Sequence, residues 1–230
     1  MEHIWQFRWL FVEGTANTIA VALVSVSISI LFGLLGAWAK LSSNKAAQKS
    51  ANFYTTVIRG IPDLVLMLLI FYGGQQLLND IGDRTKLWGY VEINHFVAGA
   101  GTIGFIFGAY MTETFRGAVL AIPRGQIEAG IACGMTKIQI FYRIIWPQMV
   151  RYAIPSFTNN WLVLLKTTAL VSVLGLHELV YNANAIGRKF REPFTFLFMA
   201  LIIYLILTAV SEFGLKKLEK KYSAGVRRAE

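Results

Sequence analysis

The sequence predicts an all-α integral membrane protein with five transmembrane helices. Its composition supports this class, because 55% of the 230 residues are hydrophobic and 15% are charged, whereas soluble domains usually contain about 25% charged residues. Uncharged runs long enough to cross a bilayer as a helix, about 20 residues, also recur along the chain. The sequence contains no linker, low-complexity tract or convincing repeat, so residues 1–230 are expected to form one domain.

The spans follow from the apolar runs in order. The first is predicted at residues 14–39, which contain no charged residue. The second, at about 54–78, contains Pro62 together with Arg59 and Asp63, which stand one helical turn apart. We therefore expect a proline-kinked helix in which the two opposite charges pair. The remaining spans are predicted at about 96–120, 152–176 and 193–210.

Lysine and arginine are distributed unevenly between the two sides of such a protein. Fourteen lie in the segments after the first and third spans and in the C-terminal tail, and six lie in the N-terminus and the other two connections. Because basic residues accumulate on the cytoplasmic side, the C-terminus is predicted to be cytoplasmic and the N-terminus external. The net charge of +9 is then an orientation signal, and nucleic acid is not expected as a partner.

The segment from about 123 to 147 interrupts the apolar pattern and is predicted to form a cytoplasmic loop of two short helices. Pro123 ends the third span, Glu128 is an acid that would stabilise a new helix N-terminus, and Gly134 permits a sharp turn. Pro147 is expected to end the second short helix, which carries an apolar stripe. The stripe consists of Ile138, Phe141, Tyr142 and Ile145. It could fill a groove on a partner protein or lie on lipid headgroups.

A spaced pattern runs through this loop: an acid followed by two small residues, a glycine about one turn later, and a closing Ile-x-x-Pro. Its members are Glu128, Ala129, Gly130, Gly134, Ile144 and Pro147. The pattern resembles the cytoplasmic "EAA" loop of the permease subunits of ATP-binding-cassette (ABC) importers, with Trp146 in place of the usual leucine.

The resemblance extends over nearly the whole chain. Arg59-Gly60-Ile61-Pro62 is similar to the Arg-Gly-Thr-Pro segment of amino-acid permeases, with Ile61 in place of threonine. The segments around Gly108-Ala109-Tyr110 and Asn159-Asn160 also match this polar amino-acid branch. Within the branch, the chain is most similar to the Q-type membrane subunit of the histidine and lysine-arginine-ornithine uptake system.

This resemblance implies the fold of a type I ABC importer transmembrane domain and a part in the uptake of amino acids, above all histidine, arginine, lysine or ornithine. The chain would hold no cofactor and no catalytic site, because ATP and Mg²⁺ would bind a separate dimer of cytoplasmic ATPase subunits. A paralogous permease subunit and a periplasmic amino-acid-binding protein would complete the complex. Its location would be the bacterial inner membrane, with the N-terminus in the periplasm, and the loop at 123–147 would receive the movement of the ATPase.

Polar side chains in the fourth span are candidates for the translocation path, because polar groups within a membrane usually face a bundle interior or a watery cavity. They are Ser156, Asn159, Asn160, Lys166 and Thr167. They could line the path or form hydrogen bonds between helices. The fourth span contains no carboxylate, so a cationic substrate side chain would find its acidic partner on the paralogous subunit or the binding protein.

The predicted second and third spans each contain a pair of opposite charges. Arg59 and Asp63 could neutralise each other, which we favour, or Arg59 could reach a substrate carboxylate. Glu113 and Arg116, three residues apart near the cytoplasmic end of the third span, are predicted to pair and to act as a gate or to anchor the loop.

Other classes of protein find little support. No Gly-x-x-x-x-Gly-Lys-Ser/Thr, Gly-x-Ser-x-Gly or His-Glu-x-x-His motif occurs, so neither nucleotide binding nor hydrolysis is expected on this chain. One cysteine and three scattered histidines predict no metal site. The remaining alternative is an ion-coupled secondary transporter, for which Asp63 and Glu113 are the candidate membrane carboxylates.

Overall fold

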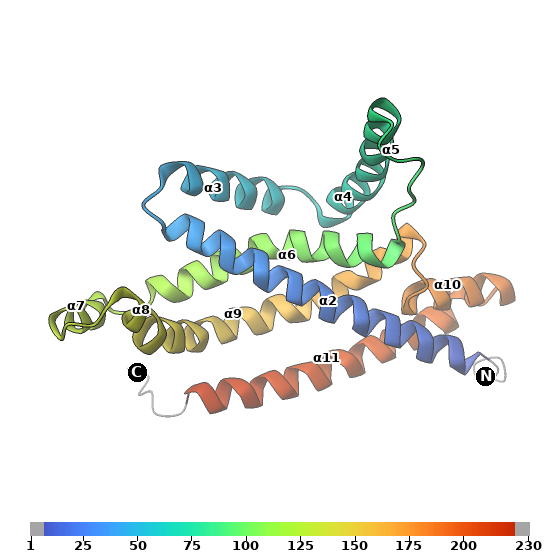
Figure 1. The fold of residues 1–230 in the computed structure, drawn as a ribbon. Helices are drawn as coiled ribbons and strands as arrows, with labels where there is room; N and C mark the ends of the chain where they lie inside the picture. The colour runs from blue at the N-terminus through green and yellow to red at the C-terminus, as the bar shows by residue number, and fades with distance from the viewer. Residues whose placement is uncertain (1–6, 224–230) are drawn as a thin grey trace.

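The computed structural model describes residues 7–223, and every regular element in that range is helical (Figure 1). The long helices run lengthwise through the molecule, and shorter helices lie along one side of them and at both ends (Figure 1). The α-helices are α2 (Arg8–Leu41), α3 (Lys45–Gly60), α4 (Asp63–Leu68), α5 (Gly74–Thr85), α6 (His95–Leu120), α7 (Arg124–Ala132), α8 (Lys137–Ile140), α9 (Trp146–Thr167), α10 (Leu179–Phe190) and α11 (Pro193–Ser223). Two π-helices, η1 (Leu69–Gly73) and η2 (Phe141–Ile145), and a 3₁₀ helix, η3 (Thr168–Leu174), join some of them.

The core of the bundle is the contact between α2 and α6, the most extensive helix pair in the described chain. Glycines let the two backbones approach closely. A Cβ atom at Gly108 would lie 2.6 Å from Cβ of Phe32, and one at Gly33 would collide with Met111. Small residues serve this purpose in membrane bundles, where helices associate through close packing because lipid is as apolar as the helices themselves.

The predicted spans at 14–39, 96–120, 152–176 and 193–210 are helical, as α2, α6, α9 with η3, and α11. By length and composition, three helices could cross a membrane: α2, the run Asp63–Thr85, and Pro193–Tyr222. A fourth is added if the bent pair Lys137–Leu174 and Leu179–Phe190 forms one span. The described chain is therefore a multi-pass helical protein with three to four apolar spans by this measure, because α6 is not counted.

The second predicted span was wrong in its boundaries. Residues 54–78 do not form one kinked helix, because α3 ends at Gly60 and α4 begins at Asp63. Ile61 has extended backbone angles (φ −114°, ψ 139°), as expected for a residue before proline, which is pushed away from the helical region. Arg59 and Asp63 consequently lie on different helices and form no ion pair.

Helix α10 was not anticipated, and it packs against α11 and α2 at the end of the bundle near residue 7 (Figure 1). Its N-terminus is capped by Glu178, whose carboxylate accepts hydrogen bonds from the backbone N–H groups of Val180 (3.0 Å) and Tyr181 (2.7 Å). The hydroxyls of Thr18 and Tyr204 lie 3.4 Å from the same carboxylate. Glu178 is fully buried, and these contacts join α2, α10 and α11.

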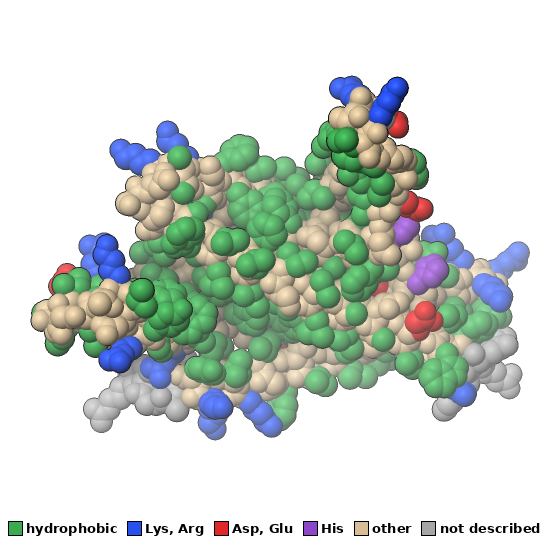
Figure 2. Space-filling view, in the orientation of Figure 1, with side chains coloured by type: hydrophobic (Ala, Val, Ile, Leu, Met, Phe, Trp, Pro, Cys, Tyr) green, Lys and Arg blue, Asp and Glu red, His purple; other side chains and the backbone are tan. Residues whose placement is uncertain are grey.

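Charged side chains are concentrated towards the ends of the face shown in Figure 2. Figure 2 shows lysine and arginine gathered at the two ends of the long helices and at the tip of α5, with mostly hydrophobic side chains between them. This is the distribution expected when the long helices cross a bilayer and their ends reach water.

Candidate functional site

The loop predicted to dock a partner is built on a tight turn after α7. Gly134 has a left-handed backbone with φ +76°, which glycine adopts without steric cost. Its N–H donates to the carbonyl oxygen of Ile131 (2.9 Å), and the N–H of Met135 donates to that of Gly130 (3.0 Å). This pair of bonds is a Schellman motif, so the turn predicted at Gly134 is confirmed.

Beyond the turn, α8 begins with a capping box. The backbone N–H of Gln139 donates to Oγ1 of Thr136 (3.3 Å), and the backbone N–H of Thr136 donates to Oε1 of Gln139 (2.8 Å). This capping box was not predicted, although Thr-x-x-Gln is a recognisable signature of a helix start. The two motifs together end α7 and restart the helix within a few residues.

Gly130 and Ile144, two members of the predicted loop pattern, are neighbours in space. A Cβ atom at Gly130 would lie 2.9 Å from Cδ1 of Ile144, so a glycine there lets α7 lie against η2 without displacing the end of the Ile144 side chain. Glu128 and Ala129 are exposed on α7. Glu128 lies in the second turn of α7 and not at its N-terminus, because the helix already begins at Arg124. Its side chain forms no ion pair with the rest of residues 7–223.

Pro147 does not end a separate short helix, contrary to the prediction. The chain continues from α8 through η2 into α9 without a break. The N–H of Trp146 donates to the carbonyl oxygen of Phe141, five residues earlier, which is the widened π pattern. Pro147 has no N–H to donate and its ring would crowd a regular preceding turn, so a widened turn directly before it accommodates the proline within a continuous helix.

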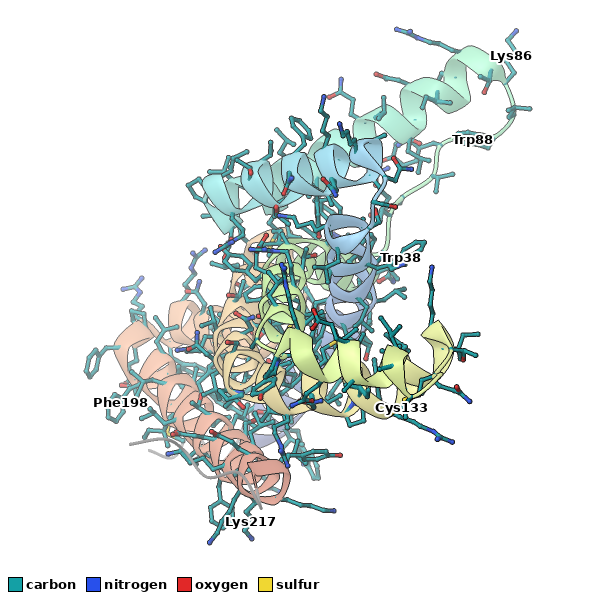
Figure 3. All side chains as sticks on the ribbon, turned by 90° about the vertical axis from the view of Figure 1, so that its left-hand side faces the viewer. Trp38, Lys86, Trp88, Cys133, Phe198 and Lys217 are labelled. Carbon is teal, nitrogen blue, oxygen red and sulfur yellow. The ribbon has the colours of Figure 1, made fainter. Side chains whose placement is uncertain are left out.

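The loop presents apolar side chains to its surroundings. Ile131, Ile138 and Tyr142 are 61%, 69% and 66% exposed, so two of the four residues of the predicted stripe, Ile138 and Tyr142, are largely uncovered within the described chain. Phe141 and Ile145 instead border an apolar groove beside α2. Figure 3 looks onto this end of the molecule, where the exposed Cys133 marks the turn and Lys217 marks the end of α11.

A polar cleft lies between α3, α6 and α9. It consists of two cavities of about 510 and 500 Å³ that share Arg59, Tyr110 and Glu113. The first extends along α9 to Ser156, Asn159 and Asn160, and the second extends along α3 to Thr55 and reaches Lys40 of α2. Arg59, Asn159 and Asn160, three of the residues predicted for the translocation path, are thus brought together.

Glu113 is the centre of an ion cluster in this cleft. Its Oε1 lies 2.5 Å from Nζ of Lys40, and its Oε2 lies 2.9 Å from Nη2 of Arg116. Lys40 also donates to Oγ1 of Thr55 (2.6 Å). The predicted pairing of Glu113 with Arg116 is confirmed. The part played by Lys40 was missed, because the sequence gives no sign of a partner 73 residues away.

Asn160 forms a hydrogen bond between helices, since its Nδ2 donates to Oγ1 of Thr114 on α6 (2.9 Å). Asn159 is exposed and has no hydrogen-bond partner among the described residues. The sequence left open whether these polar residues bond between helices or line the path. Asn160 does the first, and Asn159 faces the open cleft.

Asp63, Lys166 and Thr167 do not line the cleft. Asp63 lies at the start of α4, and Thr167 is buried with its hydroxyl bonded to the carbonyl oxygen of Val163 (3.0 Å). Lys166 is exposed and borders a separate hollow formed with α10 and α11. Within residues 7–223, no three histidine, cysteine or acidic side chains are grouped as metal ligands would be.

Comparison with known proteins identifies the family to which this chain is similar. The family described as "Binding-protein-dependent transport system inner membrane component" matches residues 29–224. The histidine/lysine/arginine/ornithine transport system permease protein HisQ of Escherichia coli (strain K12) is 48% identical over 227 residues, 99% of both chains. The octopine transport system permease protein OccQ of Rhizobium radiobacter is 42% identical, over 97% of this chain and 94% of the relative.

A solved structure described as "Crystal structure of an amino acid ABC transporter with histidines" superposes with a TM-score of 0.81. It is 30% identical in sequence, and the match covers 95% of this chain and 97% of that one. The all-helical chain thus has the fold of a type I ABC transporter permease, as predicted. The chain belongs to the family of binding-protein-dependent transport system inner membrane components.

Proposed function

We propose that this chain is a membrane permease subunit of an ABC importer that takes up amino acids, above all basic ones, by ATP-driven alternating access. The observation that carries the proposal is the 48% identity, over essentially the full length of both chains, to a histidine/lysine/arginine/ornithine permease. The superposition on an amino-acid ABC transporter supports the same function.

The ATPase activity would reside on a partner, a dimer of cytoplasmic subunits that bind ATP and Mg²⁺. The loop from α7 to η2 is the proposed docking element. Its support is the compact turn at Gly134 together with exposed apolar side chains such as Ile138 and Tyr142, which are suited to a groove on a partner. The exposed Glu128 would contact the ATPase at the same place. A paralogous permease and a periplasmic binding protein complete the proposed complex.

In this proposal the chain crosses the bacterial inner membrane five times, through α2, the run from α4 to α5, α6, α9 with η3, and α11. The N-terminus is periplasmic and the C-terminus cytoplasmic. The lysine-rich end of α11 and the docking loop lie at the same end of the bundle, and the start of α2 lies at the opposite end (Figure 1). This arrangement supports the orientation, because basic residues favour the cytoplasmic side.

The polar cleft at Arg59, Glu113 and Asn159 is the part of the translocation path that this subunit would provide. The ion cluster of Glu113 sits where the cleft approaches the cytoplasmic end of α6, so it is the proposed gate or anchor for the loop. Because α9 contributes amides and no carboxylate, the acidic contact for a basic substrate would come from the paralogous subunit or the binding protein.

The experiment is reconstitution of the chain with its copurifying partners in liposomes that contain ATP. Histidine, arginine, lysine and ornithine are each supplied with the periplasmic binding protein, and both uptake and ATP hydrolysis are measured. We expect uptake of at least one basic amino acid together with stimulated hydrolysis. Uptake that needs an ion gradient and no ATPase would support an ion-coupled carrier instead.

A further inference from the structure

The polar cleft contains a cation, Arg59, for which the described part of the chain supplies no paired carboxylate. Arg59 is exposed, and its guanidinium lies 5.3 Å from the centre of the Tyr110 ring. No acidic side chain of residues 7–223 forms an ion pair with it. A guanidinium stacked on an aromatic ring keeps its edge N–H groups available, and that edge matches a carboxylate in a bidentate pair.

The one carboxylate of the described chain that lines the cleft, Glu113, already has cationic partners. Both oxygens of Glu113 are used, one by Lys40 and one by Arg116. Asp63 lines neither cavity. The cations at the cleft therefore outnumber its carboxylates, and the cleft attracts an anionic group.

The cleft also has room and a neutral donor for such a group. Cavities of about 510 and 500 Å³ fall within the usual range for small-molecule sites, about 300–1,000 Å³. Asn159 is exposed in the first cavity and has no hydrogen-bond partner in the described chain, so its amide is free for a ligand.

We propose that Arg59, stacked on Tyr110, binds the α-carboxylate of the transported amino acid, with Asn159 as a second donor. This inference rests on the proposed function, which supplies the amino acid. The excess of positive charge has a further consequence: it repels the cationic side chain of a basic substrate. The substrate is therefore oriented with its carboxylate towards this subunit and its side chain away from it, towards the paralogous subunit.

The test measures binding to the complex of this chain with its partner subunits in lipid nanodiscs, without ATP or binding protein. A labelled basic amino acid is displaced either by the same amino acid or by its carboxamide, which lacks the negative charge. The wild-type complex is expected to prefer the carboxylate. Arg59→Gln should weaken binding of the amino acid about ten- to hundredfold, the value of a charged hydrogen bond, and leave binding of the carboxamide unchanged.

Two further variants define the result. Arg59→Lys keeps the charge and loses the bidentate geometry, so it should retain part of the preference and also serves if Arg59→Gln does not assemble. Arg84→Gln removes an equally exposed arginine at the end of α5, outside the cleft, and should behave as wild type. Size-exclusion chromatography confirms assembly of each complex.

The inference is overturned if Arg59→Gln keeps the wild-type preference for carboxylate over carboxamide, or if the assembled wild-type complex binds no free amino acid. ATP-driven uptake by the wild-type complex with its binding protein separates this failure from a failure of the proposed function. Normal uptake with an unchanged preference removes only the role of Arg59, whereas absence of uptake removes the function itself.

Discussion

Gly134→Ala should uncouple the loop from its partner through backbone strain alone. The residue has φ +76°, and the left-handed region costs a residue with a side chain about 1–2 kcal/mol. No atom lies within 4 Å of the position that a Cβ would occupy, so no collision adds to this cost. The two hydrogen bonds of the turn depend on this conformation. The strain therefore destabilises the turn that joins α7 to α8.

A penalty of about 1–2 kcal/mol lowers the population of the native turn relative to alternatives by a factor of about 5–30. If the ATPase binds only the native turn, its affinity for the permease falls by up to the same factor. The measurement is binding of the purified ATPase subunit to the permease in nanodiscs, for example by biolayer interferometry.

The same loop offers a matched control. Gly125 lies in α7, has no positive φ, and likewise has no atom within 4 Å of a Cβ position, so Gly125→Ala should bind the ATPase as wild type does. Gly134→Asn should recover part of the affinity, because asparagine tolerates the left-handed region better than alanine. Wild-type affinity of Gly134→Ala, or an equal loss for Gly125→Ala, would refute the reasoning.

Three other perturbations follow from the structure. Glu113→Gln leaves the nearly buried Lys40, with an 8% exposed side chain, without its carboxylate. We expect a loss of about 3–5 kcal/mol, seen as a lower thermal stability of the detergent-solubilised complex. Gly33→Ala places a Cβ against α6, and we expect destabilisation of about 1–3 kcal/mol from overpacking, seen as a lower yield of folded protein. Cys133, the one cysteine of the sequence, is exposed, so a membrane-impermeant maleimide should label it in inside-out vesicles and not in right-side-out vesicles.

The two stability predictions have matched control variants. Glu212→Gln disrupts an exposed ion pair with Lys216 and should cost no more than about 1 kcal/mol; equal losses for the two glutamine variants would contradict the role of burial. Gly214→Ala adds a Cβ where nothing lies within 4 Å and should fold normally. Labelling of Cys133 from the periplasmic side would reverse the proposed orientation of the chain.

Features that depend on near neighbours in sequence could be predicted. The apolar runs gave the positions of α2, α6 and α11, because each residue in a helix that crosses lipid must itself be compatible with lipid. The turn at Gly134 was recognisable because a left-handed backbone selects for glycine locally. The pairing of Glu113 with Arg116 was predictable because residues three apart share one face of a helix.

The wrong predictions came from assuming one fixed effect of proline on a helix. Pro62 was expected to kink a continuous helix, yet the helix is broken there: α3 ends at Gly60, Ile61 is extended, and α4 begins at Asp63. Pro147 was expected to end a helix, yet a π turn accommodates it. Proline restricts the chain in the same way in both cases, so the residue by itself does not decide whether a helix breaks or widens.

By itself, the sequence determined that this chain is a helical membrane protein with a glycine-hinged loop between its third and fourth predicted spans. Only the tertiary structure decided which polar groups meet: Lys40 joins Glu113 from α2, and Asn160 bonds to α6 while its neighbour Asn159 remains open to the cleft. The physical reason is that helical periodicity orders residues along one helix, whereas contacts between helices depend on how their faces rotate and pack together.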